Sequence, residues 1–156
     1  MITKINLNHE VIKGDDNLLL PQQILVKDFD ADTSSFFSSN FNRVHNLPQQ
    51  IIPIQVDSFG GSVYSLLGIL DVIAASKKPV ATYVNSKAMS CGAVLLSAGN
   101  HGLRFASKNS TILIHEVESS SYGKNANIQA DAGETARLND ILLEILAKNS
   151  KKRKSF

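Results

Sequence analysis

A lone serine stands among very small side chains in the stretch KAMSCGAVLLSAG, residues 87–99. Ser90 directly precedes an apolar helical run, and serine at such a place usually caps the helix. The same small neighbours would also let a substrate approach the hydroxyl, with the N–H of Cys91 close enough to stabilise an oxyanion. The stretch is not the G-x-S-x-G elbow, since residue 88 is alanine. The residues alone therefore leave two interpretations, a cap or a nucleophile.

Two adjacent glycines occur in DSFGGSV, residues 57–63, between a predicted strand and a predicted helix. Gly60 and Gly61 allow a backbone turn that a Cβ would obstruct, and they leave N–H groups at a helix N-terminus, where anionic oxygen is favoured. The pair lacks the lysine of a phosphate-binding loop and the spacing of a dinucleotide site. By itself it predicts a strand-to-helix turn with Ser62 as the helix cap.

A histidine lies near the end of the run STILIHE, residues 110–116, which is predicted to be a strand. The carboxyl ends of parallel strands are where α/β sheets place catalytic groups, although structural histidines are also common there. A serine hydroxyl needs a base to become a nucleophile, and His115 is the base that Ser90 would need. Lys87 is a weaker alternative base.

The elements that must position these residues alternate along the chain. Runs of aliphatic and β-branched residues predict strands at residues 22–29, 49–57, 79–84 and 110–116. Apolar residues at three- and four-residue spacing predict helices at residues 32–44, 63–74, 90–98 and 127–147. Asp32 and Thr33 are predicted to cap the first helix, and Pro53 predicts an edge position or a bulge in the second strand. This alternation predicts an α/β fold with a largely parallel sheet.

Composition excludes several other classes of protein. The 156 residues are 43% hydrophobic and 19% charged, which predicts a single globular domain. The run Lys151–Lys154 more than accounts for the net charge of +2, so the rest of the chain is slightly acidic and we expect no nucleic-acid partner. Cys91 is the single cysteine, which excludes an internal disulfide, and we expect no metal and no cofactor. The sequence has no membrane-spanning apolar run and no signal-peptide core, so we expect no membrane partner and a cytoplasmic location.

Three segments together, in this order, resemble the proteolytic subunit of the ATP-dependent Clp protease (the ClpP family). They are DSFGGSV, AMSCGAVLLSAG and LRFASKNSTILIHE, and the likeness runs from about Gln23 to Asn149. The resemblance implies an α/β fold of the ClpP/crotonase type, a ββα superhelix with a protruding handle made of a strand and a long helix. It implies Ser90 as the nucleophile, His115 as the general base, and the N–H groups of Gly61 and Cys91 as the oxyanion hole. Arg104, Asn109 and Ser110 also match family positions.

The resemblance further implies an organisation and a set of partners. The chain would be a single ClpP-like domain, with a head at about 20–116, a handle at about 117–150 and a basic tail at 151–156. Such subunits form two stacked heptameric rings around a chamber that cuts peptides or unfolded protein. An AAA+ unfoldase of the Clp type feeds the chamber. The sequence contains no G-x-x-x-x-G-K-[ST] loop, so any ATP hydrolysis belongs to that separate partner.

The chain also departs from the family pattern. Phe59 replaces the proline that precedes the glycines, and the sequence stops at Phe156 before the family's catalytic aspartate. Glu116 and Glu118 are close to His115 in sequence, but their position along a strand predicts that their side chains point elsewhere. The acids of the last helix are expected to face solvent: Asp131, Glu134 and Asp140. Three interpretations remain, namely a serine endopeptidase, a catalytically impaired scaffold subunit, or a crotonase-like acyl-CoA enzyme.

Overall fold

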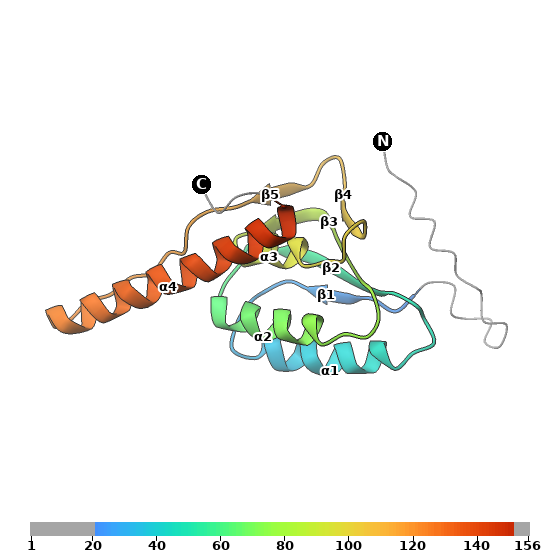
Figure 1. Ribbon diagram of the computed structural model, residues 1–156, viewed down its shortest axis with the longest axis horizontal. Coiled ribbons are helices and arrows are strands. Elements are labelled where there is room, and N and C mark those ends of the chain that lie inside the picture. The colour runs from blue at the N-terminus through green and yellow to red at the C-terminus, as the bar shows by residue number, and fades with distance from the viewer. Residues whose placement is uncertain (1–20, 152–156) are drawn as a thin grey trace. The chain divides into compact units, whose positions relative to one another are not determined.

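The computed structural model describes residues 21–151 and divides the chain into two compact units, one ending at Leu113 and one beginning at Ile114 (Figure 1). Most of the predicted basic tail lies outside the described residues. The first unit contains β1 (Ile24–Val26), α1 (Thr33–His45), β2 (Ile52–Ser58), α2 (Val63–Ala74), β3 (Val80–Met89), α3 (Cys91–Ser97), β4 (Arg104–Ala106) and β5 (Thr111–Leu113). The second unit contains α4 (Asn125–Ser150). The predicted α/β class is confirmed.

The sheet of the first unit is entirely parallel, with the strand order β1-β2-β3-β4 and with β5 also paired to β3. The long strand β3 pairs with β4 through residues 82–84 and with β5 through residues 87–89. Ser58 lies opposite Ala88 in the register between β2 and β3. Because parallel strands end at the same edge of a sheet, the turn that follows β2 lies beside the turn that follows β3.

The core of the first unit lies between the sheet and its helices. In Figure 1, α1 and α2 run along the same side of the sheet, and α3 follows directly from β3. The largest fully buried aliphatic side chains come from β2, α2 and α3, namely Ile52, Ile54, Leu66, Ile69 and Leu95. A central parallel strand buried on both faces requires such a nearly continuous apolar run.

Pro53 was predicted to mark an edge or a bulge in the second strand. The edge alternative is wrong, because β2 is an inner strand between β1 and β3. The register of β2 with β3 does shift, between Val56 and Ser58 and not at Pro53 itself. The N–H of Ile52 donates to Pro79 O at 2.9 Å, so the next backbone nitrogen, that of Pro53, points to the other side. On that side the pairing with β1 begins only at Ile54. The missing N–H of Pro53 therefore costs the sheet no hydrogen bond in its paired region.

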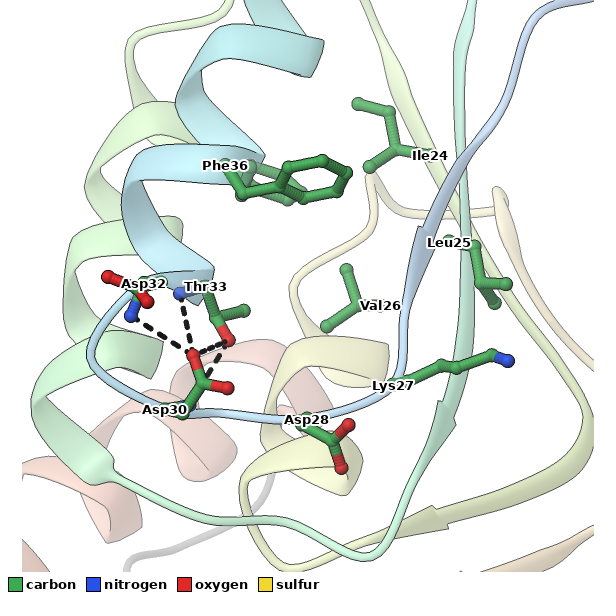
Figure 2. Close-up of a pocket in the computed structure, with 10 residues that line it drawn as sticks. Ile24, Leu25, Val26, Lys27, Asp28, Asp30, Asp32, Thr33 and Phe36 are labelled. Atoms are coloured by element: carbon green, nitrogen blue, oxygen red, sulfur yellow. Dashed lines mark hydrogen bonds between the residues drawn. The ribbon is translucent and has the colours of Figure 1, made fainter.

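The first helix is capped differently from the prediction. Asp32 occupies the N-cap position, but its side chain makes no capping hydrogen bond. Asp30 Oδ1 instead accepts hydrogen bonds from the N–H groups of Asp32 and Thr33 at 3.0 and 2.9 Å (Figure 2). β4 was not predicted, because a strand of three residues is too short to show a period of two.

In the second unit, the segment after β5 runs along α4. Three hydrogen bonds join alternate residues of this segment to the helix: Val117 N–H to Asn139 Oδ1 at 3.1 Å, Ser119 Oγ with Thr135 Oγ1 at 2.9 Å, and Ser121 Oγ to Asp131 Oδ2 at 2.5 Å. We call these three bonds the polar ladder. The spacing of the bonding residues agrees in the segment and in the helix, because two residues of extended chain and four residues of helix both rise by about 6–7 Å.

The strand that the resemblance implied for the handle does not form in residues 117–124. A strand requires a neighbouring strand to hydrogen-bond with, and this segment bonds to helix side chains instead. The long helix itself is present as predicted, and it extends to Ser150. None of the helices within residues 21–151 is long and apolar enough to cross a lipid bilayer.

Candidate active site

Ser90 lies at the sharp junction between β3 and α3. Its backbone has a φ of 53° and a ψ of −122°, a conformation that residues with a Cβ rarely adopt. Its N–H donates to Leu113 O at 2.9 Å, and its carbonyl accepts from the N–H of Ala93 at 2.9 Å. The side chain makes no capping hydrogen bond to α3. The cap interpretation is therefore wrong for this hydroxyl, which instead sits on a strained strand-to-helix turn of the kind that presents a nucleophile.

The first residue of the glycine pair, Gly60, lies directly against Ser90, and the second, Gly61, packs on Phe29. Gly60 has a φ of 112°, and a Cβ placed on it would stand 2.6 Å from Ser90 Cβ. Gly61 has a φ of 141°, and a Cβ placed on it would stand 2.4 Å from Phe29 O. Both positions therefore require glycine for conformation and for space. The turn predicted from sequence brings bare backbone up to the serine.

Hydrogen bonds on both sides hold this turn. The N–H of Gly60 donates to Ser58 Oγ at 3.0 Å, and Ser58 is fully buried. The N–H of Ser62 donates to Phe29 O at 2.6 Å. Ser62 Oγ accepts from the N–H of Ser65 at 3.4 Å, which confirms the predicted cap of α2.

Cys91 fixes the start of α3 against the same turn. Its thiol is buried, with 1% of the residue exposed, and donates to Gly61 O at 3.2 Å. Burial raises the pKa of the Cys91 thiol, and this disfavours the thiolate that a cysteine nucleophile would need. Cys91 thus acts as a packing residue, and the N–H groups of Gly61 and Cys91 belong to the two backbone segments that this thiol joins.

Lys87, the alternative base, is paired with an acidic and an aromatic side chain. Its Nζ donates to Asp57 Oδ1 at 2.7 Å and lies 4.4 Å from the centre of the Phe59 ring. The hydrogen bond from Lys87 lowers the pKa of Asp57. A carboxylate and an aromatic face both stabilise the charged ammonium, which has no lone pair to accept the serine proton.

His115 belongs to the second unit, two residues beyond the end of β5. Its side chain is one-third exposed, and its Nδ1 lies 3.8 Å from Glu118 Oε1. The prediction that Glu118 points away is wrong, because β5 ends at Leu113 and strand alternation does not extend to these residues. The Glu118 carboxylate is 88% exposed, and the distance is too long for a direct hydrogen bond.

The acids of α4 have other partners. Asp131 accepts from Ser121, and Glu134 pairs with Arg137 at 2.7 Å. Asp131 and Asp140 are exposed, as predicted from the sequence. In residues 21–151, no group of three or more histidine, cysteine, aspartate or glutamate side chains could hold a metal ion.

A shallow pocket of about 360 Å³ lies between β1 and the start of α1 (Figure 2). Three aspartates line it, namely Asp28, Asp30 and Asp32. The hydrogen bonds that Asp30 accepts, first of all from the Thr33 hydroxyl, lower the pKa of this carboxyl. Asp30 thus serves the start of the helix, and the pocket brings together no nucleophile and base.

The match to a family model decides the identity. The Clp protease model matches residues 23–155. The chain belongs to the Clp protease family. Among curated Clp protease relatives, the "ATP-dependent Clp protease proteolytic subunit" of Deinococcus radiodurans is 38% identical over 103 residues, covering 66% of this chain and 50% of that protein. The "ATP-dependent Clp protease proteolytic subunit 2" of Frankia casuarinae is 37% identical over 106 residues, covering 68% and 49%. The chain spans about half the length of these Clp protease subunits.

Sequence reasoning about this Clp protease family member missed one group of side chains beside the site. The group has three members: Asp57 in β2, Phe59 in the turn after β2, and Lys87 in β3. Lys87 contacts the other two side chains just before the glycine pair. Asp57 and Phe59 are two residues apart, so they share a side of the chain, and that spacing is the only signal the sequence carried. The register between β2 and β3 brings Lys87 to them.

Proposed function

We propose that this chain is a serine endopeptidase subunit that cleaves peptides or unfolded polypeptides through an acyl-enzyme. One observation carries the proposal: Ser90 stands on a strained β3–α3 turn, directly against Gly60 of the glycine pair, in a chain of the Clp protease family. That arrangement sets the hydroxyl on a strand-to-helix turn, where the missing side chain of Gly60 leaves bare backbone beside it.

In the proposed reaction, Ser90 Oγ attacks the carbonyl carbon of the substrate peptide while His115 takes the serine proton. The N–H groups of Gly61 and Cys91 stabilise the oxyanion that forms. The tetrahedral intermediate collapses, the C–N bond breaks, and the leaving amine receives the proton from His115. Water then attacks the serine ester, again with His115 as base, and releases the carboxylic acid and free Ser90.

The proposal includes the organisation expected from the family resemblance. The chain would act as one domain, with a head at about 20–116 and a handle at about 117–150, in two stacked heptameric rings. An AAA+ unfoldase would deliver unfolded chains to the enclosed sites. The two relatives are named as ATP-dependent proteolytic subunits, and this supports a separate ATP-hydrolysing partner.

Active-site labelling tests the nucleophile. A fluorophosphonate probe should modify the wild-type chain at Ser90, and Ser90→Ala should abolish the modification, as intact-mass spectrometry would show. Ser97→Ala is a matched control from the other end of α3, and it should be labelled like wild type. Equal labelling of Ser90→Ala would refute the assignment. A folded wild type that is never labelled would favour the scaffold interpretation.

Sedimentation and peptide cleavage test the rest of the proposal. The purified chain should sediment as a large homo-oligomer and cleave short fluorogenic peptides. It should degrade a folded reporter only when an AAA+ unfoldase and ATP are added. A monomer at micromolar concentration would contradict the ring assembly, and degradation of the folded reporter by the chain alone would contradict the gated chamber.

A further inference from the structure

The turn at Gly60 and Gly61 needs contacts that restrict its backbone. Gly60 and Gly61 both have positive φ, and glycine has more backbone freedom to lose than any other residue. Three hydrogen bonds hold the pair and the residue after it: Gly60 N–H donates to Ser58 Oγ, the Cys91 thiol donates to Gly61 O, and Ser62 N–H donates to Phe29 O. The residue before the pair is Phe59, which is 72% exposed. Because Phe59 is exposed and directly precedes two glycines, another side chain must contact it if its position is to be fixed.

The structure supplies that partner from β3. Ser58 points into the core, so its neighbours Asp57 and Phe59 direct their side chains to the other side. Lys87 Nζ contacts both of them, at 2.7 Å from Asp57 Oδ1 and 4.4 Å from the Phe59 ring centre. The side chains of Lys87 and Asp57 are only 23% and 28% exposed, so solvent screens their attraction less than that of a fully exposed pair.

We infer that Lys87 is a positioning residue for catalysis, which holds the Gly60–Gly61 turn in place through Phe59 and Asp57. The ammonium is anchored by the carboxylate, and the ring is then fixed on the ammonium by a cation–π contact. A proline at position 59 would restrict the same backbone by its own ring, without any partner. In this chain a non-covalent clamp from the neighbouring strand restricts the turn instead.

Hydrogen–deuterium exchange tests the clamp without relying on activity. In the full chain, Lys87→Met should raise the exchange rate of peptides spanning residues 59–62 about fivefold, as expected for losing one cation–π contact and one ion pair. Lys78→Met is the matched control, since it removes a lysine that donates to Leu47 O at 2.5 Å elsewhere in the same unit. Unchanged exchange in Lys87→Met, or an equal rise in Lys78→Met, would overturn the inference.

Labelling of Ser90 tests the functional consequence and rests on the proposed function. Lys87→Met should slow fluorophosphonate labelling about fivefold, and adding Phe59→Pro should restore both the labelling rate and the slow exchange. Phe59→Leu should slow labelling as much as Lys87→Met, and the double variant Phe59→Leu/Lys87→Met should be no slower than either. Additive effects, or no rescue by Phe59→Pro in a folded chain, would overturn the clamp. Failure of the wild type to label, with the exchange results as expected, would refute only the proposed peptidase activity.

Discussion

The two proposed halves of the catalytic machinery are held in different ways. In the unit that carries Ser90, buried groups make the stabilising contacts: Thr82 is fully buried and its Oγ1 donates to Leu96 O at 2.6 Å, and Gly61 packs on the backbone of Phe29. Around His115, the polar ladder and Glu118 hold the chain, and the ladder's side-chain pairs are exposed. Buried hydrogen bonds and close packing set one geometry, whereas exposed bonds compete with water. Packing therefore fixes the turn of the proposed nucleophile, whereas the segment of the proposed base is held by bonds that water can replace.

The largest loss of stability should come from a substitution in the closely packed region, at Gly61. Gly61→Ala would place a Cβ 2.4 Å from Phe29 O at a φ of 141°, so strain and overlap together should lower the free energy of unfolding by roughly 3–5 kcal/mol. Urea denaturation would measure this loss.

Gly133→Ala is the matched control in α4, where a new Cβ would meet nothing within 4 Å. Replacing glycine by alanine inside a helix should raise stability by about 1 kcal/mol. Similar effects of the two substitutions would remove the contrast between the two regions.

A smaller loss of stability should follow from removing one hydroxyl group in each of the two units. Thr82→Val keeps the shape of the side chain but leaves the buried carbonyl of Leu96 without its donor, which should cost about 1–3 kcal/mol. Ser119→Ala removes an exposed bond to Thr135 and should change stability by less than about 0.5 kcal/mol. Thermal unfolding of both variants provides the comparison, and a larger loss for Ser119→Ala would reverse it.

The ion pair between Asp57 and Lys87 should give a stability contribution that depends on pH. Because the hydrogen bond from Lys87 lowers the pKa of Asp57 in the folded state, the unfolded chain binds this proton more readily. The contribution is therefore complete above the unfolded pKa and is lost as the pH falls through the folded pKa.

Melting temperatures measured from roughly pH 6 down to pH 3 would test this sign. The difference between wild type and Asp57→Asn should shrink on acidification, and Lys87→Met should show the same trend. A difference that grows at low pH would contradict the ion pair.

The smallest effect is expected from the carboxylate beside His115. Since Glu118 is 88% exposed and 3.8 Å from Nδ1, Glu118→Gln should slow fluorophosphonate labelling by no more than about fivefold. The slowing should diminish in high salt, which screens exposed charges. Glu116→Gln is the control and should label at the wild-type rate. A thousandfold loss in Glu118→Gln would instead make this acid an essential orienting group.

The sequence by itself determined the elements and the local chemistry. Apolar spacing predicted α2 from Val63 to Ala74 with Ser62 as its cap, and the structure confirms both. Two adjacent glycines predicted the turn after β2, because only glycine accepts such backbone angles. These features depend on residues within a few positions of one another, so a local pattern is sufficient to specify them.

Only the tertiary structure decided which residues meet. The sequence could not choose between Ser90 as a cap and Ser90 on a strained turn, because the answer depends on β5 and on Gly60, which come from other parts of the chain. Pro53 looked unsuitable for an inner strand until the register showed that pairing with β1 begins one residue later. Lys87 met Asp57 and Phe59 only through the pairing of β3 with β2. Contacts of this kind are set by strand order and register, which tertiary packing fixes and local spacing does not.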